Sequence, residues 1–277
     1  MDISPQRAAF RRLHESGCFV IPNPWDIGTA MMLKHLGFKA LATTSSGFSF
    51  SRGLPDTDWA VPRDMALAHI AEIVRATDLP VNADFESGYA RDPAGVAENC
   101  RLCAATGVAG LSIEDHGDTA EEVIYPFDLA VDRIRAAAEA LKGTGVLLTA
   151  RCEAHLFGLP DAQGTVLKRL VAYAEAGADV LYAPGLRTPE QIREVVAAVA
   201  PRPVNLLISA PIGLTVADAA ALGVRRISVG SALARAAWGG FLTAARELAA
   251  EGRFDALAAA EPFGALNGFF RTHHPKA

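Results

Sequence analysis

The sequence predicts an α/β protein of the (β/α)8 barrel class. Eight short runs rich in β-branched residues recur along the 277 residues, and segments with the periodicity of a helix lie between them. Strands that alternate with helices form a parallel sheet with right-handed crossovers, and eight such units are enough for the sheet to close on itself. An open, doubly wound sheet is the alternative arrangement.

The expected strands follow one another at regular intervals. In chain order they are GCFVIP from residue 17, KALATT from 39, PVNADF from 80, AGLSIED from 109, GVLLTAR from 145, ADVLYAP from 178, PVNLLIS from 203 and RRISVG from 225. Helical patterns between them include PAGVAENCRLCAATG, FDLAVDRIRAAAEALKG, TVLKRLVAYAEAG and TPEQIREVVAAVA. Gly107, Gly177 and Gly223 stand where a helix should end before the next strand, as a left-handed C-cap requires.

The chain shows no composition break and no proline-rich linker, so we expect one barrel domain over residues 1–277. The segment from about residue 240, FLTAARELAAEGRFDALAAAEPFGALNGFF, is expected to add one or two helices after the barrel.

Composition and charge argue against several classes of protein. The formal net charge is -5 and the arginines are scattered among acids, which argues against nucleic acid as a partner. The N-terminal MDISPQRAAFRRLHESG lacks the apolar core of a signal peptide, and no run is apolar enough to span a bilayer. We therefore expect a cytoplasmic protein that does not enter a membrane.

The four cysteines do not indicate a disulfide framework, because Cys18, Cys100, Cys103 and Cys152 are few and irregularly spaced. Cys100 and Cys103 form a C-x2-C pair within a helical pattern, and no second pair completes a zinc site. Two buried helix thiols are therefore expected in preference to a metal or redox motif.

Polar side chains crowd the ends of the expected strands, where a barrel of this class carries its chemistry. In strand order they are Trp25 and Asp26, Ser45 to Gly47, Asp84 and Glu86, Glu114 and Asp115, Arg151 and Glu153, and Tyr182. Carboxylates that converge there repel one another unless a cation neutralises them, and oxygen ligands favour Mg²⁺, or Mn²⁺, over zinc. An acid after a strand can instead cap the next helix, which is the alternative for Asp115 and Asp92.

Several motifs together resemble the isocitrate lyase and phosphoenolpyruvate mutase superfamily over nearly the whole chain. They are NPWD at 23, ATTSSGFSFSRGLPD at 42, NADFESG, SIEDH, TARCEA, LYAPGL and RRISVGSALARAA. The resemblance implies a (β/α)8 barrel that binds magnesium and a 2-oxo acid, and that makes or breaks a bond next to an enolate. It also implies a homo-oligomer, a dimer or tetramer, whose C-terminal helices after Ser231 are exchanged between subunits.

The resemblance also assigns roles to individual residues. The direct metal ligand falls on Asp84, and ligands that act through water fall on Asp56, Glu86 and Glu114. The substrate contacts implied are Ser45, Ser46, Gly47, Phe48, Asp84, Arg151 and Tyr182. The catalytic candidates are Arg151, Glu114 and His116.

The loop after the fourth strand departs from the superfamily pattern. Lyases of the superfamily carry a Lys-Lys/Arg-Cys-Gly-His motif there, but this chain reads EDHGDTAEEVIYPFDLAVDRI from Glu114, with no cysteine or lysine. The loop of the mutases is absent as well. His116 and Tyr125 are candidates for a replacement acid or gate, against an exposed loop histidine and a packing tyrosine; His155 is a further candidate.

The expected function is Mg²⁺-dependent cleavage of a carbon–carbon bond, or decarboxylation, in a small 2-oxo (di)carboxylic acid through a metal-stabilised enolate. The alternatives are a carbon–phosphorus enzyme such as a phosphonopyruvate hydrolase, and a 2-oxo acid binding protein with little turnover. A barrel with a purely structural rim is the remaining possibility. The late ISVGSAL segment also fits the phosphate sites that some barrels carry near that strand.

Overall fold

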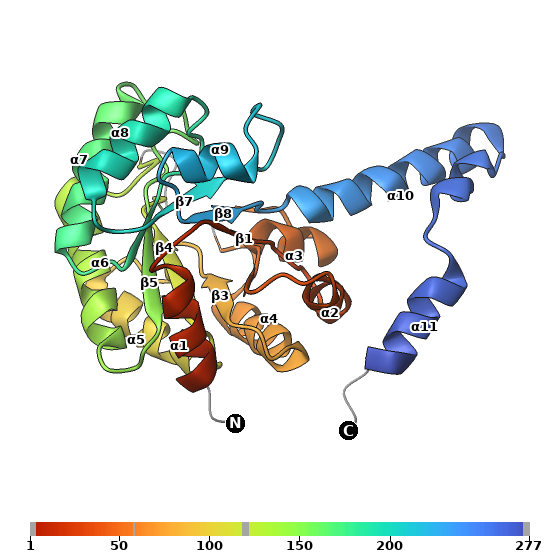
Figure 1. The fold of residues 1–277 in the computed structure, drawn as a ribbon, viewed down its shortest axis with the longest axis horizontal. Helices are drawn as coiled ribbons and strands as arrows, with labels where there is room; N and C mark the ends of the chain where they lie inside the picture. Colours follow the sequence, from red (N-terminus) through yellow and green to blue (C-terminus); the bar gives the residue numbers. More distant parts are fainter. Residues whose placement is uncertain (1–3, 58, 118–121, 274–277) are drawn as a thin grey trace.

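Eight parallel strands form a single sheet that curves into a barrel in the computed structural model, which describes residues 4–57, 59–117 and 122–273 (Figure 1). The strands are β1 (Phe19–Ile21), β2 (Leu41–Ala42), β3 (Val81–Asp84), β4 (Gly110–Glu114), β5 (Leu147–Arg151), β6 (Val180–Tyr182), β7 (Val204–Leu207) and β8 (Arg226–Ser228). Their order in the sheet is β1-β8-β7-β6-β5-β4-β3-β2. Every strand lies within a run that the sequence predicted, and the barrel class is confirmed.

The barrel is nearly closed between its first two strands. The β1 and β8 strands pair in parallel with Val20 opposite Ile227. On the other side of β1 the Ala42 N–H donates to the Pro22 carbonyl at 3.0 Å, and the Asn23 side chain donates to the Thr43 carbonyl at 2.9 Å. These two bonds join β1 to β2, so the open doubly wound sheet is ruled out.

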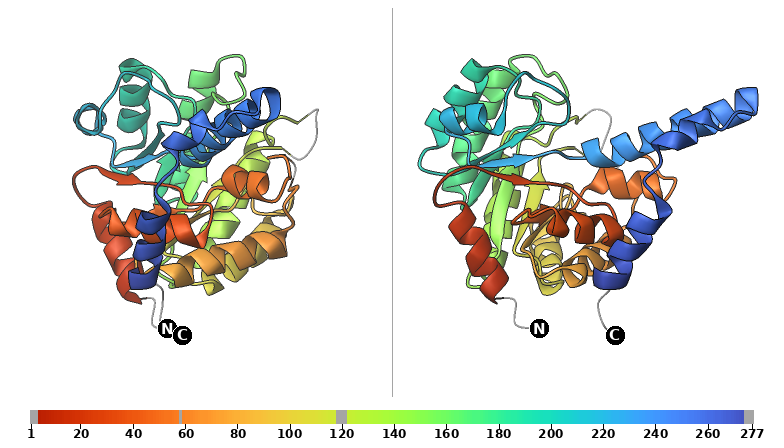
Figure 2. Two further views of the ribbon diagram at one scale, coloured as in Figure 1. Left: turned by 90° about the vertical axis from the view of Figure 1, so that its right-hand side faces the viewer. Right: turned by 45° about the vertical axis from the view of Figure 1, so that its right-hand side comes forward.

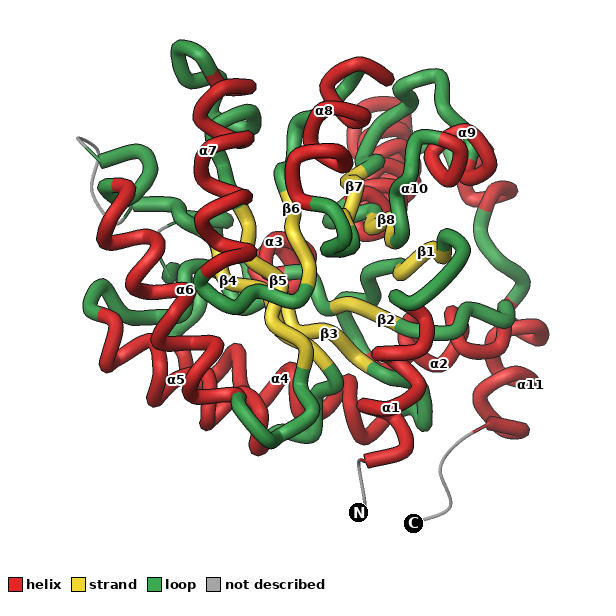
Figure 3. Tube along the Cα trace, turned by 60° about the vertical axis from the view of Figure 1, so that its left-hand side comes forward, coloured by secondary structure: helices red, strands yellow, loops and turns green. Residues whose placement is uncertain are grey.

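Helices alternate with the strands and surround them (Figure 3). They are α1 (Ser4–Leu13), α2 (Ile27–His35), α3 (Ser45–Ser51), α4 (Arg63–Ala76), α5 (Pro93–Ala105), α6 (Phe127–Leu141), α7 (Ala162–Glu175), α8 (Pro189–Val199) and α9 (Val216–Ala221). Gly107, Gly177 and Gly223 have φ of +98°, +111° and +91°, which confirms that these glycines take the left-handed conformation after α5, α7 and α9. Asp92 caps α5 by accepting from the Gly95 N–H at 2.9 Å.

The main core lies between the outer surface of the sheet and helices α5 to α8. Strand residues such as Leu111, Leu148 and Leu181 pack there against buried helix side chains. Cys100 and Cys103 are fully buried in this core on α5 with free thiols, so the prediction of two buried helix thiols is confirmed. No described helix combines the length and apolar character needed to cross a bilayer.

The N-terminal helix α1 covers the amino end of the barrel. Phe10 is fully buried against Ile21, Ala40 and neighbouring strand residues, and its ring meets the His14 ring edge-on at 4.7 Å between centroids. The polar chemistry therefore has an open exit only at the opposite, carboxyl end of the strands.

The C-terminal helices leave the barrel. Figures 1 and 2 show α10 (Ala232–Glu251) projecting away from the strands, followed by the short helix η1 (Asp255–Ala259) and by α11 (Phe263–His273). The α11 helix returns to α2, where the Phe269 ring meets His35 at 5.2 Å. Large apolar side chains on this extension are exposed, among them Trp238, Phe241 and Phe263.

Candidate active site

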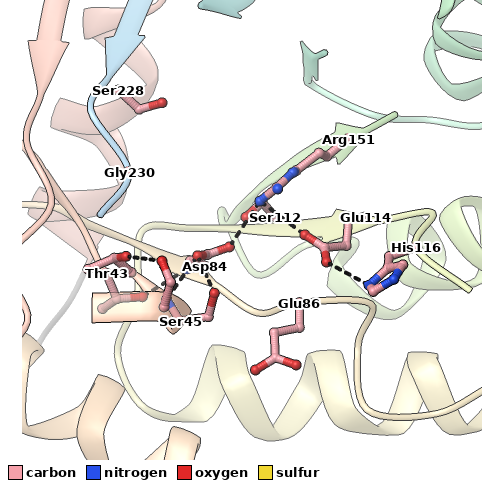
Figure 4. Close-up of polar contacts among 12 residues, drawn as sticks. Thr43, Ser45, Asp84, Glu86, Ser112, Glu114, His116, Arg151, Ser228 and Gly230 are labelled. Carbon is pink, nitrogen blue, oxygen red and sulfur yellow. Dashed lines mark hydrogen bonds and ion pairs between the residues drawn. The ribbon is translucent and has the colours of Figure 1, made fainter. Parts of the chain in front are cut away.

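The carboxyl ends of β3, β4 and β5 bring three predicted site residues together (Figure 4). Glu114 and Arg151 are direct register partners across β4 and β5, and Arg151 and Tyr182 are partners across β5 and β6. Side chains at partner positions of a sheet share one face, here the inner face of the barrel. The Arg151 Nη1 lies 3.0 Å from Glu114 Oε2 and 3.7 Å from Asp84 Oδ1.

Asp84 ends β3 and is oriented by the chain after β2. One of its carboxylate oxygens, Oδ2, accepts from both the backbone N–H and the hydroxyl of Ser45, each at 3.0 Å. The Asp84 backbone N–H in turn donates to the Thr43 hydroxyl at 2.8 Å. The other oxygen faces Arg151, so Ser45 and Arg151 hold the carboxylate from two sides (Figure 4).

Arg151 lies among carboxylates and is almost entirely shielded from solvent. Besides Glu114 and Asp84 it contacts Glu153, whose two oxygens meet the guanidinium Nε and, at 3.0 Å, Nη2. The Arg151 side chain is 15% exposed, and nearby Glu114 and Glu153 raise its pKa well above the ordinary value despite its burial. Arg151 therefore keeps its charge at every physiological pH.

Asp115 supports this cluster from behind, and the alternative that it caps a helix is wrong. It is buried, and its Oδ1 accepts from the Glu153 backbone N–H at 2.8 Å. Its Oδ2 accepts from Arg169 at 2.9 Å and from the Tyr173 hydroxyl at 2.7 Å, both on α7. Charge pairing with a buried arginine outweighs capping here, and the result is a fixed backbone at Glu153.

Glu86 lies on a strained turn after β3. It has φ of +47° and Tyr89 has φ of +55°, a left-handed conformation that side chains other than glycine rarely adopt. The Tyr89 hydroxyl donates to Glu86 Oε1 at 2.8 Å, and the buried guanidinium of Arg133 binds the Ser87 and Ala90 carbonyls of the turn. Burial, together with nearby Asp84, raises the pKa of Glu86 to about 7, although the Tyr89 hydrogen bond opposes the shift.

Two adjoining cavities open from the cluster. One, of about 410 Å³, runs from Asp56, Asp84 and Arg151 at the rim into the barrel as far as Arg226. The other, of about 470 Å³, adjoins it at Ser45, Asp56 and Arg151 and extends over Glu86, Glu114 and His116. Asp56, Asp84, Glu86 and Glu114 thus line connected space, with Asp56 in hydrogen-bonding reach of Ser45. Within the described chain no three histidine, cysteine or acidic side chains are close enough to hold one ion directly.

The predicted substrate turn is only partly presented to the cavity. Ser45 and Ser46 line it, as does Tyr182, whose ring faces the Arg151 guanidinium at 5.2 Å. Gly47 and Phe48 are buried in α3, where the Gly47 N–H donates to the Thr44 hydroxyl and the Phe48 N–H to the Thr44 carbonyl.

The candidate acids lie at different distances from the cluster. His116 Nδ1 is 3.9 Å from Glu114 Oε1, and its ring packs on Phe157 at 4.7 Å between centroids. Tyr125 is fully buried beneath the Arg133 guanidinium, as a packing residue would be. His155 is bonded to Gln163 at 2.7 Å. Residues 118–121 of the departing loop lie outside the described residues.

The ISVGSAL segment offers little to a phosphate. The backbone N–H groups of Val229 and Gly230 both donate to the Asn23 side-chain oxygen, at 3.0 and 2.9 Å. Donors that are already paired within the protein are poor partners for an additional anion.

The sequence reasoning missed polar residues deeper in the barrel and the role of Glu153. Asn82, Ser112, Asn205, Arg226 and Ser228 line the inner part of the first cavity. A signal was present in RRISVG, where Arg226 and Ser228 are two residues apart and therefore share the inner face of a strand.

The barrel, with its acidic cavity at the carboxyl end of the strands, places the chain among the barrel enzymes, which carry their active sites at that end. The chain belongs to the phosphoenolpyruvate phosphomutase family, whose pattern matches residues 10–249. Two relatives illustrate the range. An uncharacterized protein of Mycobacterium tuberculosis is 35% identical over 80% of this chain and 82% of its own length. An oxaloacetate decarboxylase of Paraburkholderia xenovorans is 28% identical over 82% of this chain and 76% of its own length.

Solved structures agree with this assignment. A Burkholderia cenocepacia protein that carries only the provisional description lyase/mutase is 48% identical, with a TM-score of 0.91 over 97% of this chain and 96% of its own. A 2,3-dimethylmalate lyase, described as a member of the PEP mutase/isocitrate lyase superfamily, is 25% identical, with a TM-score of 0.82 over 96% of this chain and 93% of its own. The superfamily resemblance of the sequence is thereby confirmed.

Proposed function

We propose that the chain is a Mg²⁺-dependent enzyme that decarboxylates, or cleaves a carbon–carbon bond in, a small 2-oxo acid with a second carboxylate. The observation that carries the proposal is the position of Arg151, a fully charged guanidinium at the rim of the 410 Å³ cavity in contact with Asp84 and Glu114. The relative named oxaloacetate decarboxylase supports this substrate class.

The donor set fits a hard divalent cation. Asp56, Asp84, Glu86 and Glu114 offer only carboxylate oxygens, and they line connected cavities. The raised pKa of Glu86 reflects its burial near Asp84, and a bound cation would relieve that repulsion. We assign Asp84 as the direct ligand and the other three as ligands through water, an arrangement that Mg²⁺ favours because it retains several waters.

When bound, the cation supplies a Lewis acid that polarises the 2-oxo group and stabilises negative charge on the adjacent carbon. The protein residues do the rest. Arg151 binds an oxygen of the 2-oxo acid with a rigid fork, and Ser45 and Ser46 offer hydroxyls to its carboxylate. His116, beside Glu114, is placed to return a proton after the bond breaks.

We also propose that the C-terminal helices join a second copy of the chain. Trp238 and Leu242 on α10 line an apolar groove of about 480 Å³ together with Phe50 and Leu54, and Phe241 beside them is 59% exposed. An apolar surface of this kind on a projecting helix is typical of an interface between subunits. Light scattering after size exclusion should give a dimer or tetramer, and Phe241→Asp should shift it toward the monomer; a monomeric parent chain would refute this.

The function is tested by supplying Mg²⁺ with either oxaloacetate or phosphonopyruvate. We expect oxaloacetate to be consumed faster than its spontaneous rate, with a carbon–carbon cleavage product, and phosphonopyruvate to release no phosphate. Phosphate release alone would establish the carbon–phosphorus alternative. Binding of both acids by calorimetry, with no product at high enzyme concentration, would establish a binding protein.

A further inference from the structure

Arg226 is a second buried arginine in the candidate active-site cavity. It begins β8, is 3% exposed, and lines the inner part of the same 410 Å³ cavity that holds Asp84 and Arg151 at its rim. Neither the expected metal ligands nor the expected substrate contacts include it.

The partners of Arg226 are all neutral. Its Nε donates to the Asn205 side-chain oxygen at 2.8 Å, and Nη2 donates to the Thr149 hydroxyl at 3.1 Å. Its Nη1 lies 3.5 Å from His14 Nε2, a long contact. The geometry leaves part of the fork, at Nη1, only weakly used.

Arg226 also lacks a counter-charge. Across residues 4–57, 59–117 and 122–273 no carboxylate forms an ion pair with it, whereas Arg151 has Glu114 and Glu153. Isolating a cation in a protein interior costs several kcal/mol, and burial lowers the pKa of Arg226 to about 10. A cavity wall is where such a charge gains most from an anionic ligand.

The surrounding wall suits a carboxylate. Ser112, Ser228 and the Tyr182 hydroxyl line the cavity near Arg226 and can donate hydrogen bonds. Burial raises the pKa of Tyr182 to about 12, so its hydroxyl keeps its proton. Ser228 faces the cavity from β8 across from Asp84 (Figure 4).

The spacing of the two arginines matches a short dicarboxylic acid. Arg226 bonds to Thr149, two residues before Arg151 on the inner face of β5. Two residues along a strand span roughly 7 Å, so the Arg226 guanidinium lies about one side-chain layer below Arg151. An extended four- or five-carbon dicarboxylic acid, hydrogen-bonded at each end, covers such a span.

We propose that Arg226 binds the distal carboxylate of a dicarboxylic 2-oxo acid, so that the substrate extends into the barrel with its 2-oxo end at Asp84 and Arg151. This assignment rests on the proposed action on a 2-oxo acid and adds the substrate class, because it selects dicarboxylic over monocarboxylic acids. Arg235 is the competing cation. It lines the mouth of the same cavity, but it is exposed, and its Nη2 donates to the Ser209 carbonyl at 2.7 Å.

The test is calorimetry at saturating Mg²⁺ with 2-oxoglutarate and with 2-oxobutyrate, which lacks only the distal carboxylate. The parent chain should bind 2-oxoglutarate on the order of 100-fold more tightly, as a buried charge-assisted pair allows. Arg226→Gln should abolish this preference while leaving 2-oxobutyrate binding unchanged. Arg226→Lys, which keeps the charge and serves if the glutamine variant does not fold, should retain part of it. Arg235→Gln should keep all of it.

Several outcomes would overturn the assignment. These are a preference that survives both Arg226 variants, a preference lost in Arg235→Gln, and an equal loss for both acids. If the parent chain binds neither 2-oxo acid, the proposed function fails, and glutarate then decides the subsite. Glutarate binding that is lost in Arg226→Gln would support the inner subsite, whereas no glutarate binding by the parent chain would overturn it.

Discussion

Arg151 and Glu153, two residues apart at the end of β5, form a two-point ion pair in which the carboxylate is 1% exposed and the guanidinium 15%. The pair uses Nε and Nη2 of the arginine, which leaves Nη1 directed at Glu114 and Asp84. Because a guanidinium is planar, fixing two nitrogens fixes the third. Glu153 therefore sets the direction in which Arg151 meets a ligand.

Replacing Glu153 with glutamine should loosen Arg151 without removing it. The amide keeps the size of the side chain but loses the charge and one acceptor, so the guanidinium should sample more than one orientation. We expect the Kd for a 2-oxo acid, measured by calorimetry with Mg²⁺, to rise by about 10- to 100-fold. Glu175→Gln, on the exposed side of α7, is the matched control. Equal affinities in Glu153→Gln and the parent chain would contradict the orienting role.

Asp115→Asn should be one of the most destabilising single-atom changes at the rim. Asp115 is the carboxylate partner of buried Arg169 and also accepts from Tyr173 and the Glu153 N–H. Removing one partner of a buried ion pair costs about 3–5 kcal/mol. Urea denaturation should show that loss of unfolding free energy, and Asp128→Asn, exposed in the first turn of α6, should change it by less than about 0.5 kcal/mol. A small effect at Asp115 would mean that water replaces the lost charge.

The architecture could be predicted because strands and turns are encoded locally. Runs such as GVLLTAR contain a complete strand, and glycines such as Gly107 supply the left-handed residue that follows a helix. The rim was predictable for the same reason, since residues at the ends of parallel strands meet at one end of a barrel. That rule brought Asp84, Glu114 and Arg151 together before any coordinates were considered.

The remaining features depend on side-chain direction and on contacts between distant segments. Asp115 has the position of a helix cap, but Arg169 and Tyr173, more than fifty residues away, determine its role. Gly47 and Phe48 follow Ser45 directly, yet Thr44 occupies their N–H groups. Local pattern contains no information about such partners, because they are set by the packing of the whole barrel.

Asp84→Asn tests the assigned metal ligand. The amide can keep the contact with Ser45, which donates to Oδ2, but it removes the charge that a divalent cation requires. Titration with Mn²⁺, followed by its paramagnetic effect on water relaxation, should show an affinity at least about 100-fold weaker, and 2-oxo acid binding should fall with it. Asp64→Asn, exposed on α4, should change neither. Unchanged Mn²⁺ affinity in Asp84→Asn would place the ion elsewhere.

The pH dependence of stability should reveal a buried neutral imidazole at the amino end of the barrel. The His14 Nδ1–H donates to the Phe10 carbonyl at 2.8 Å, and Nε2 faces the Arg226 guanidinium at 3.5 Å. Burial, together with nearby Arg226, lowers the pKa of His14 from 6.5 to about 3. Below pH 6.5 the unfolded chain therefore binds a proton that the folded chain refuses, and this contribution to stability is complete above pH 6.5 and is lost as the pH falls toward 3.

We expect His14→Gln, which does not titrate and can keep both contacts, to remove this dependence. Between pH 6.5 and 4 the parent chain should lose roughly 3 kcal/mol more unfolding free energy than the variant, measured by urea denaturation at each pH. His69, whose pKa burial lowers to about 4, should give a smaller difference when it is replaced in the same way. Parallel curves for the parent chain and His14→Gln would show that the folded barrel accepts the charged imidazole beside Arg226.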